Sequence, residues 1–162
     1  MRAITWDKFS IDTLSLVERI TQQQQSYDLI VCVMRGGCVP SSIISNALDV
    51  PMLSLGIKSY TGLQSGDIHV YQSFISDLYF MRSFSIVNSV LVVDDLSDTG
   101  KTFNYFVETY KDLFSTIHTA APYIKTGTAH VPTYYTQEFA ADEWLEFPWE
   151  STLAQPKYLH AV

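Results

Sequence analysis

The chain is poor in cysteine, and this shortage excludes several classes of protein. Among 162 residues the only cysteines are Cys32 and Cys38, with five residues between them. This is not the spacing of a zinc site with matching ligands, and we expect no disulfide from it. Cys32 lies inside an apolar run, where a buried thiol is the ordinary expectation. We therefore expect reduced thiols and a cytoplasmic protein.

Basic residues are also scarce, and long apolar runs are absent. The 10 Lys and Arg stand against 17 Asp and Glu, which gives a net charge of −7. Such a surface argues against a nucleic acid or an anionic membrane as the main partner. No apolar run approaches the roughly 18 residues of a membrane-spanning helix, and Asp7 and Lys8 interrupt any signal-peptide pattern. An anionic substrate would have to be held by loop amides, a few basic side chains and a bound cation.

Apolar residues, by contrast, make up 47% of the chain, and they predict strands that alternate with helices. Apolar runs predict strands over residues 28–33, 52–57, 90–93, 117–125 and 134–139. Helical spacing predicts helices over residues 11–20, 41–48 and 103–114. This order predicts an α/β fold with a mainly parallel central sheet flanked by helices, in a single domain over residues 1–162.

Two stretches lack a clear pattern. Residues 59–85 are predicted to form a flexible hairpin or lid, with two short strands over residues 69–71 and 78–81. Because the apolar pattern there is weak, the pairing and register of these strands stay open. Residues 141–150 are expected to be irregular.

The chain is organised around residues 89–102, which read SVLVVDDLSDTGKT. An apolar run that suits a strand buried on both faces leads to three acids, Asp94, Asp95 and Asp98, and helical spacing follows. A tight loop between a strand and a helix presents unpaired N–H groups at the positive end of the helix dipole. We therefore expect the loop to hold a phosphate. The acids are expected to hold hydroxyls or, through water, a metal ion.

Two other interpretations account for less of this stretch. Its ending, Gly100-Lys101-Thr102, matches the end of a nucleotide-triphosphate loop. The first glycine of that motif would fall at Asp95, whose carboxylate would face the phosphates, so we reject it. The remaining alternative is a plain parallel strand with a capped helix and a few surface acids, which leaves the order of the polar residues unexplained.

A second glycine loop follows the strand predicted over residues 28–33. It reads Met34-Arg35-Gly36-Gly37, and a further helix is predicted beyond it. Both glycine loops thus follow the carboxyl ends of parallel strands, where open α/β sheets bind their ligands. The two loops are expected to form one shared active site.

The polar order of residues 89–102 resembles the phosphoribosyl diphosphate (PRPP) loop of the type I phosphoribosyltransferases. The whole chain resembles the bacterial xanthine-guanine branch of this family, which acts on 6-oxopurines. Matching pieces occur in family order at residues 5–7, 35–37, 39–40, 59–60, 125, 144–146 and 148–149. The resemblance implies a type I phosphoribosyltransferase-like fold with a lid over about 59–85 and a small base-binding hood over about 125–162.

The reaction implied by the resemblance is the displacement of pyrophosphate from carbon 1 of PRPP by a purine base, with Mg²⁺ as cofactor. Asp94 and Asp95 would hold the metal ion or the ribose hydroxyls, and the Met34–Arg35 peptide would be cis. The implied PRPP-binding residues are Arg35, Gly36, Gly37, Asp94, Asp95, Ser97, Asp98, Thr99, Gly100, Lys101 and Thr102. These residue types suit the chemistry. Backbone amides and hydroxyls at the start of a helix bind phosphate, and an arginine offsets the negative charge of the departing diphosphate.

The resemblance also assigns catalytic and base-binding residues. Asp98 would hold or accept the proton at purine N7; the alternative is a carboxylate that stabilises the helix dipole. Lys125 would donate to the 6-oxo group and meet the amino group of adenine donor to donor; the alternative is a solvated lysine at a strand end. Trp144 would stack on the base beside Leu145; the alternative is a core aromatic.

Other pieces leave the substrate open. Ser59 and Tyr60 resemble the start of the family's lid, which excludes water from the reacting centre. Lys101 stands where several members of the xanthine-guanine branch have a small residue. Residues 126–128 follow Lys125 where a segment beginning with proline is more usual in that branch. The alternatives are a 6-oxopurine transferase of purine salvage, a transferase for another base, and a PRPP-binding regulator without turnover. Relatives are dimers or tetramers, so we expect a homodimer or homotetramer.

Overall fold

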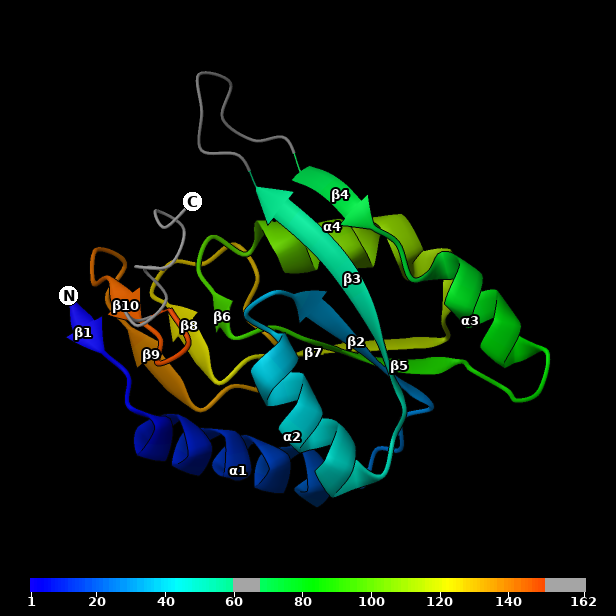
Figure 1. The fold of residues 1–162 in the computed structure, drawn as a ribbon, viewed down its shortest axis with the longest axis horizontal. Coiled ribbons are helices and arrows are strands. Elements are labelled where there is room, and N and C mark those ends of the chain that lie inside the picture. Colours follow the sequence, from blue (N-terminus) through cyan, green and yellow to red (C-terminus); the bar gives the residue numbers. More distant parts are fainter. Residues whose placement is uncertain (60–67, 151–162) are drawn as a thin grey trace, which may run out of the picture.

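A five-stranded sheet forms the centre of the protein in a computed structural model that describes residues 1–59 and 68–150 (Figure 1). The strand order is β4-β3-β2-β5-β7. These strands are β2 (Leu29–Met34), β3 (Met52–Ser59), β4 (Ile68–Gln72), β5 (Ser89–Val93) and β7 (Thr116–Ala120). Neighbours are parallel except for β4, which runs antiparallel to β3 at the edge. The predicted α/β fold with a mainly parallel central sheet is confirmed.

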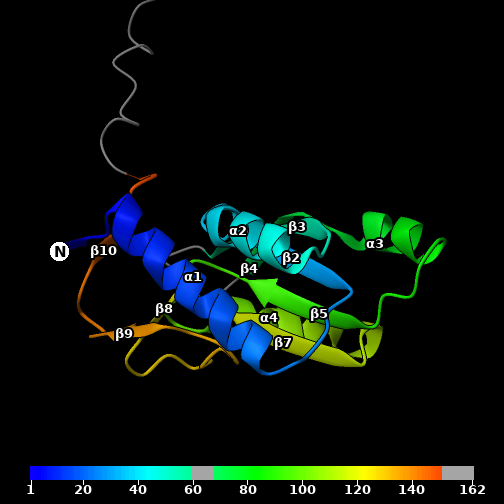
Figure 2. The ribbon, with the colours of Figure 1, turned by 90° about the horizontal axis from the view of Figure 1, so that it is seen from below.

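Helices cover both faces of this sheet (Figures 1 and 2). One face packs against α1 (Trp6–Gln22) and α2 (Cys38–Leu48), and the other against α3 (Ile75–Arg82) and α4 (Lys101–Tyr110). Among the residues that the structure describes, no helix is long and apolar enough to cross a membrane. With both faces covered, the carboxyl ends of the parallel strands remain as the place for a ligand.

The central strands are buried on both faces, which explains their unbroken apolar runs. In β2, Leu29, Val31 and Val33 belong to one core cluster, whereas Ile30 belongs to the other. Successive side chains of a strand point to opposite faces, so every position here has to be apolar. Cys32 of β2 pairs with Val93 of β5, which brings the ends of the two strands, and the loops that follow them, side by side.

A second, smaller unit joins the N-terminus to the C-terminal region. A three-stranded parallel sheet contains β6 (Leu96–Ser97), β8 (Tyr123–Lys125) and β9 (Gln137–Phe139), and β1 (Arg2–Ala3) pairs with β10 (Leu145–Glu146). The core of this unit holds the buried side chains of Ile4, Phe9, Tyr123, Phe139, Leu145 and Phe147. We call this unit the hood, because it contains the described part of the predicted hood. Residues 151–162 lie outside the described residues.

The strand predicted over residues 117–125 is wrong as a single element. It divides into β7 and β8, which belong to different sheets. The division falls at Pro122, because proline has no N–H to donate to a ladder. The Pro122 carbonyl instead accepts from the N–H groups of Thr136 and Gln137, each at 3.1 Å. This break takes the chain out of the central sheet and into the hood.

The strand predicted over residues 78–81 is also wrong, because these residues belong to α3. Phe74 and Leu78 are fully buried, whereas the residues between them are not. That is helical spacing, and a short apolar run does not by itself distinguish a helix from a strand. The helix predicted to reach residue 114 ends at Tyr110 and passes into a 3-10 turn, Lys111–Leu113.

Two predictions near the C-terminal end need correction. The strand predicted over residues 134–139 shortens to β9, and Tyr134 makes only an isolated bridge with Ala120. Residues 141–150 are not wholly irregular, because they contain β10. The partner of β10 is β1 at the opposite end of the sequence, so no local sequence pattern could predict this pairing.

The predicted lid is described in part. The strand predicted over residues 69–71 is present as β4, but it pairs in the antiparallel direction with β3 and not with a second strand among the described residues within 59–85. Tyr60 lies outside the described residues, as does the side chain of Ser59. Closure of a lid over the site stays a prediction.

Candidate active site

Two adjacent carboxylates follow β5 at the centre of the site. The N–H of Asp94 donates to the Ala120 carbonyl at 3.1 Å, and the N–H of Asp95 donates to the Asp94 carboxylate at 2.9 Å. Burial raises the pKa of Asp94 well above its ordinary value, and the neighbouring Asp95 adds to the rise. Burial also raises the pKa of Asp95 to about 6. Two carboxylates confined in this way favour a cation that relieves their repulsion.

The donor set suits a hard divalent cation. Asp94 and Asp95 offer carboxylate oxygens, and Mg²⁺ typically takes one or two such ligands together with waters and substrate phosphates. Within residues 1–59 and 68–150, no group of three His, Cys, Asp or Glu side chains could form a fuller protein cage. A metal ion held here would therefore depend on the substrate for part of its coordination.

The loop between β2 and α2 touches these carboxylates directly. A Cβ atom on Gly36 would lie 2.0 Å from Oδ2 of Asp95. A Cβ atom on Gly37 would lie 2.4 Å from the carbonyl oxygen of Val33 and 2.6 Å from that of Val93. Only glycine allows such close approach of backbone to its neighbours. The two glycine loops that were predicted to share one site are therefore in contact.

The same loop carries the predicted diphosphate-binding residues. Its Met34–Arg35 peptide is cis, as the resemblance implies. The Arg35 carbonyl accepts from the N–H of Cys38 at 3.1 Å and so closes the turn into α2. Arg35 itself is exposed, so its guanidinium is accessible to an anion that enters from solvent.

The loop between β5 and α4 leaves backbone N–H groups available at the start of a helix. Gly100 directly precedes α4 and has a φ of 79°, a conformation that favours glycine. Thr99 and Lys101 are exposed, and the N–H of Lys101 lies 3.4 Å from the Thr99 hydroxyl. The first turn of a helix has no intrahelical acceptors for its N–H groups. This loop therefore has the geometry of an anion site.

His130 supports this loop, although no spacing in the sequence singles it out as a site residue. A Cβ atom on Gly100 would lie 2.2 Å from the backbone nitrogen of His130. The Ser97 hydroxyl donates to the His130 carbonyl at 2.7 Å. The His130 ring bonds Asn104 at 2.9 Å and Thr119 at 3.0 Å. Burial lowers the pKa of His130, so the neutral ring donates through one nitrogen and accepts through the other.

A hollow of about 190 Å³ beside the acids gathers the predicted base-binding residues. It is lined by Leu96, Asp98, Lys125, Ala141, Asp142, Glu143, Trp144, Leu145 and Glu150. Lys125 is only 5% exposed, and its ammonium group donates to the Ala140 carbonyl at 3.2 Å. Lys125 is therefore not a solvated surface lysine. Trp144 is 70% exposed at the rim, so it is not a core aromatic.

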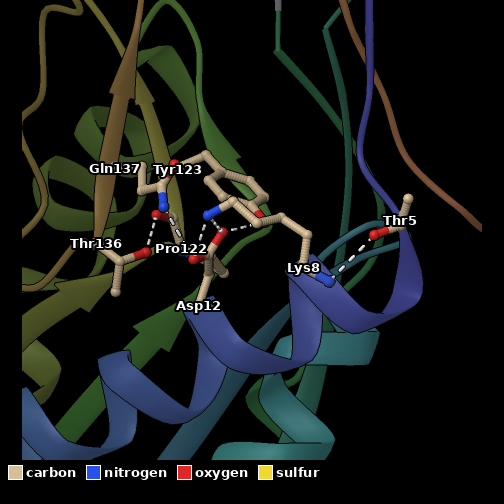
Figure 3. Close-up of polar contacts among 7 residues, drawn as sticks. All are labelled: Thr5, Lys8, Asp12, Pro122, Tyr123, Thr136 and Gln137. Atoms are coloured by element: carbon tan, nitrogen blue, oxygen red, sulfur yellow. Dashed lines mark hydrogen bonds and ion pairs between the residues drawn. The ribbon is translucent and has the colours of Figure 1, made fainter.

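A buried polar cluster ties the hood to α1 (Figure 3). Asp12 is 4% exposed, and its carboxylate pairs with the Lys8 ammonium at 2.6 Å. The Tyr123 hydroxyl donates to Asp12 at 2.8 Å, and the Gln137 amide donates to it at 3.0 Å. Tyr123 lies two residues before Lys125 on β8, so this cluster anchors the strand that carries the buried lysine. No sequence pattern reveals the role of Asp12, since Tyr123 and Gln137 are more than 100 residues away along the chain.

A larger hollow of about 570 Å³ lies away from these residues. Its lining comes from the end of α1, His118 of β7 and residues 133–135. None of the predicted site residues lines it. Size alone therefore does not locate the site, whereas the contacts between the two glycine loops do.

The fold and the paired loops are those of an enzyme class that binds a sugar phosphate at the carboxyl ends of parallel strands. A sequence model of the phosphoribosyl transferase domain matches residues 6–155. The chain therefore belongs to the phosphoribosyltransferase family, of the type I that its sequence resembles.

Solved structures agree with this assignment. The chain is similar to a purine phosphoribosyltransferase from Pyrococcus horikoshii, with 28% identity over 93% of this chain and 94% of that one, and a TM-score of 0.73. It has the fold of the xanthine-guanine-hypoxanthine phosphoribosyltransferase of Helicobacter pylori, with 22% identity over 94% and 95% of the two chains and a TM-score of 0.75. A Neisseria gonorrhoeae protein solved with bound ppGpp also shares the fold, with 21% identity over 93% and 90% and a TM-score of 0.77.

Proposed function

We propose that the protein transfers the 5-phosphoribosyl group of PRPP to a 6-oxopurine (guanine, xanthine or hypoxanthine) and releases pyrophosphate, as a cytoplasmic enzyme of purine salvage. The observation that carries this proposal is the buried ammonium of Lys125 in one hollow with Asp98 and Trp144. The similarity to a purine phosphoribosyltransferase from Pyrococcus horikoshii supports a purine as acceptor.

The donor would lie across the two glycine loops. Residues 97–102 would bind the 5′-phosphate through N–H groups at the start of α4 and through the threonine hydroxyls. Arg35 and the backbone of Gly36 and Gly37 would bind the diphosphate, whose negative charge grows as it departs. Asp94 and Asp95 would hold the ribose hydroxyls or a Mg²⁺ ion, and the ion would supply further neutralisation of the diphosphate when it is bound.

The acceptor base would lie in the smaller hollow. Lys125 has three N–H donors and uses one on Ala140, so it has capacity to donate to a purine O6. Adenine carries an amino group at that position, and a donor facing a donor in a buried site costs about 1–3 kcal/mol. Asp98 would hold or accept the N7 proton as the glycosidic bond forms, and Trp144 would cover one face of the ring.

A base panel tests the proposal. Purified protein is incubated with labelled PRPP, Mg²⁺ and guanine, xanthine, hypoxanthine, adenine or uracil, and the nucleoside monophosphates are measured. Turnover with at least one 6-oxopurine and none with adenine is the expected result. PRPP binding without turnover would identify a regulator instead, and turnover with uracil alone would identify a transferase for another base. Repeating the panel with EDTA tests the metal requirement.

The assembly proposed is a homodimer or homotetramer. Apolar side chains on and after α3 are largely exposed in the single chain: Tyr79, Phe80, Phe84 and Ile86. Association of copies would remove such surface from water. Sedimentation equilibrium measures the mass of the assembly, and a monomer at micromolar concentration would refute this part.

A further inference from the structure

The only two cysteines of the chain lie at the two ends of the diphosphate loop, with their sulfur atoms 3.4 Å apart. Cys32 is in β2 and is 1% exposed, whereas Cys38 is the first residue of α2 and is partly exposed. Arg35, Gly36 and Gly37 lie between them. Two unoxidised sulfur atoms in contact across a ligand-binding loop need only a modest approach to become bonded.

We propose that Cys32 and Cys38 are a modification site, at which a reversible disulfide forms across the diphosphate loop and weakens the binding of PRPP. The disulfide itself stands on the geometry of the two sulfur atoms. Its effect on PRPP rests on the proposed function.

The reaction proceeds by exchange with a low-molecular-weight disulfide, such as oxidised glutathione. The Cys38 thiolate attacks one sulfur of that disulfide, forms a mixed disulfide and releases one glutathione thiolate. The Cys32 thiolate then attacks the sulfur of Cys38 and releases the second glutathione. The two protein thiols are oxidised, the reagent is reduced to two thiols, and the protons of the protein thiols pass to the released glutathione.

The structure sets the order of these two steps. Cys38 is reached from solvent, whereas Cys32 is enclosed in the sheet. Burial raises the pKa of the Cys32 thiol to about 12, and the hydrogen bond with Cys38 adds to the rise. Cys32 is therefore inert toward dissolved reagents, and it reacts only with a sulfur already held beside it.

Closing the disulfide disturbs the loop. A disulfide is about 2.05 Å long, so the two sulfur atoms have to move together by more than an ångström. The backbone of Cys32 is held in the sheet between Ser54 of β3 and Val93 of β5, whereas Cys38 lies at the end of the loop. The movement therefore falls on Cys38 and the loop. Gly36 and Gly37 already touch Asp95 and the ends of both strands, so the loop has no room to shift without losing its position over the acids.

The test oxidises the protein in buffers with defined ratios of oxidised to reduced glutathione. An intact mass lower by two hydrogen atoms, with no alkylatable thiol, shows the disulfide, and reduction restores both thiols. PRPP affinity, measured by calorimetry on the same samples, is expected to fall, and turnover is expected to fall by about 10²-fold, the size of rate loss that a 1 Å misplacement can cause. Cys38→Ser and Cys32→Ala retain the affinity of the reduced protein and do not respond to oxidation.

Three results would overturn the proposal. They are a stable glutathione adduct on Cys38 without a disulfide, a disulfide between two chains, and an intramolecular disulfide that leaves PRPP affinity unchanged. If the reduced protein fails to bind PRPP at all, the proposed function falls with the inhibitory effect, while the mass measurement still decides whether the disulfide forms. The two failures are thus distinguishable.

Discussion

The two halves of the site are built in different ways. The proposed donor end consists of two glycine loops in contact, with Gly36 against the Asp95 carboxylate and Gly37 against the end of β5. The hood depends on side chains: Lys125 is buried beneath the rim residue Trp144, and Asp12 anchors the strand that carries the lysine. A backbone site tolerates almost no added atom, whereas a side-chain site can be altered one group at a time. Substitutions can test this difference.

The largest effect is expected at Asp98, where the two halves meet. Asp98→Ala should lower turnover by about 10²–10⁴-fold, because a positioned acid-base group contributes about that factor. PRPP affinity should change much less, and steady-state kinetics measures both quantities. Asp98→Asn serves as the matched control, since it keeps the size and one acceptor oxygen but cannot take the proton. A turnover number that Asp98→Ala leaves unchanged would remove Asp98 from the mechanism.

A single methyl group on the donor loop should have the next largest effect. Gly36→Ala places its Cβ 2.0 Å from Oδ2 of Asp95, so the loop or the carboxylate has to move. We expect kcat/KM for PRPP to fall by about 10²-fold with little change in KM for the base. Gly127→Ala is the control for added volume, because no atom lies within 4 Å of the Cβ position of Gly127; its φ of 82° strains the backbone there instead. Equal effects of the two substitutions on kcat/KM for PRPP would show that contact with Asp95 does not explain the loss.

Removal of the buried ammonium should alter base recognition alone. Lys125→Met keeps the length of an enclosed side chain and deletes the donor to O6. The cost should be about 1–3 kcal/mol of base affinity, with KM for PRPP unchanged and the preference against adenine reduced. A base panel with the variant measures both. Loss of PRPP affinity in this variant would contradict the division between the two halves.

The buried cluster on α1 should contribute to folding and not to donor binding. Asp12→Ala removes the acceptor of Tyr123 and Gln137, and an unpaired buried group costs about 1–3 kcal/mol. Urea unfolding measures this loss. Glu108→Ala is the control, because the pair between Glu108 and Lys111 is exposed and worth under about 1 kcal/mol. Equal losses in both variants would show that the cluster does not hold the hood.

The smallest effect is a pH dependence at the donor end. The pKa of Asp95 is raised from 3.8 to about 6, so this carboxyl becomes protonated as the pH falls through 6. Its burial therefore favours the folded state at acid pH, and this contribution is lost as the pH rises through about 6. We expect Mg²⁺ to bind more tightly above pH 6 than below it, and calorimetry across this range would show the change. An affinity that is constant from pH 5 to pH 7, a range chosen about that pKa, would contradict a role for Asp95 in holding the ion.

The same difference explains how much the sequence could predict. The two glycine loops could be predicted because each is continuous in sequence, over residues 34–37 and 94–102, and because the strands before them contain the apolar runs 29–34 and 90–93. The hood was only partly readable. Pro122 divides a continuous apolar run, and β10 pairs with the first strand of the chain. Asp12 meets Tyr123 from far along the sequence, so neither residue could reveal the contact without the structure.

The contact of His130 with the turn before α4 has a consequence for how the sequence of such a protein can change. The segment that begins after Lys125 supplies Ala129, whose N–H donates to the Thr99 carbonyl at 3.0 Å. Only a few residues thus separate Lys125, which would recognise the base, from the segment that contacts the turn at Thr99, which would bind the sugar phosphate. An insertion or deletion in this segment would shift the lysine and the turn at once. Base preference and affinity for the donor would therefore change together as the sequence evolves.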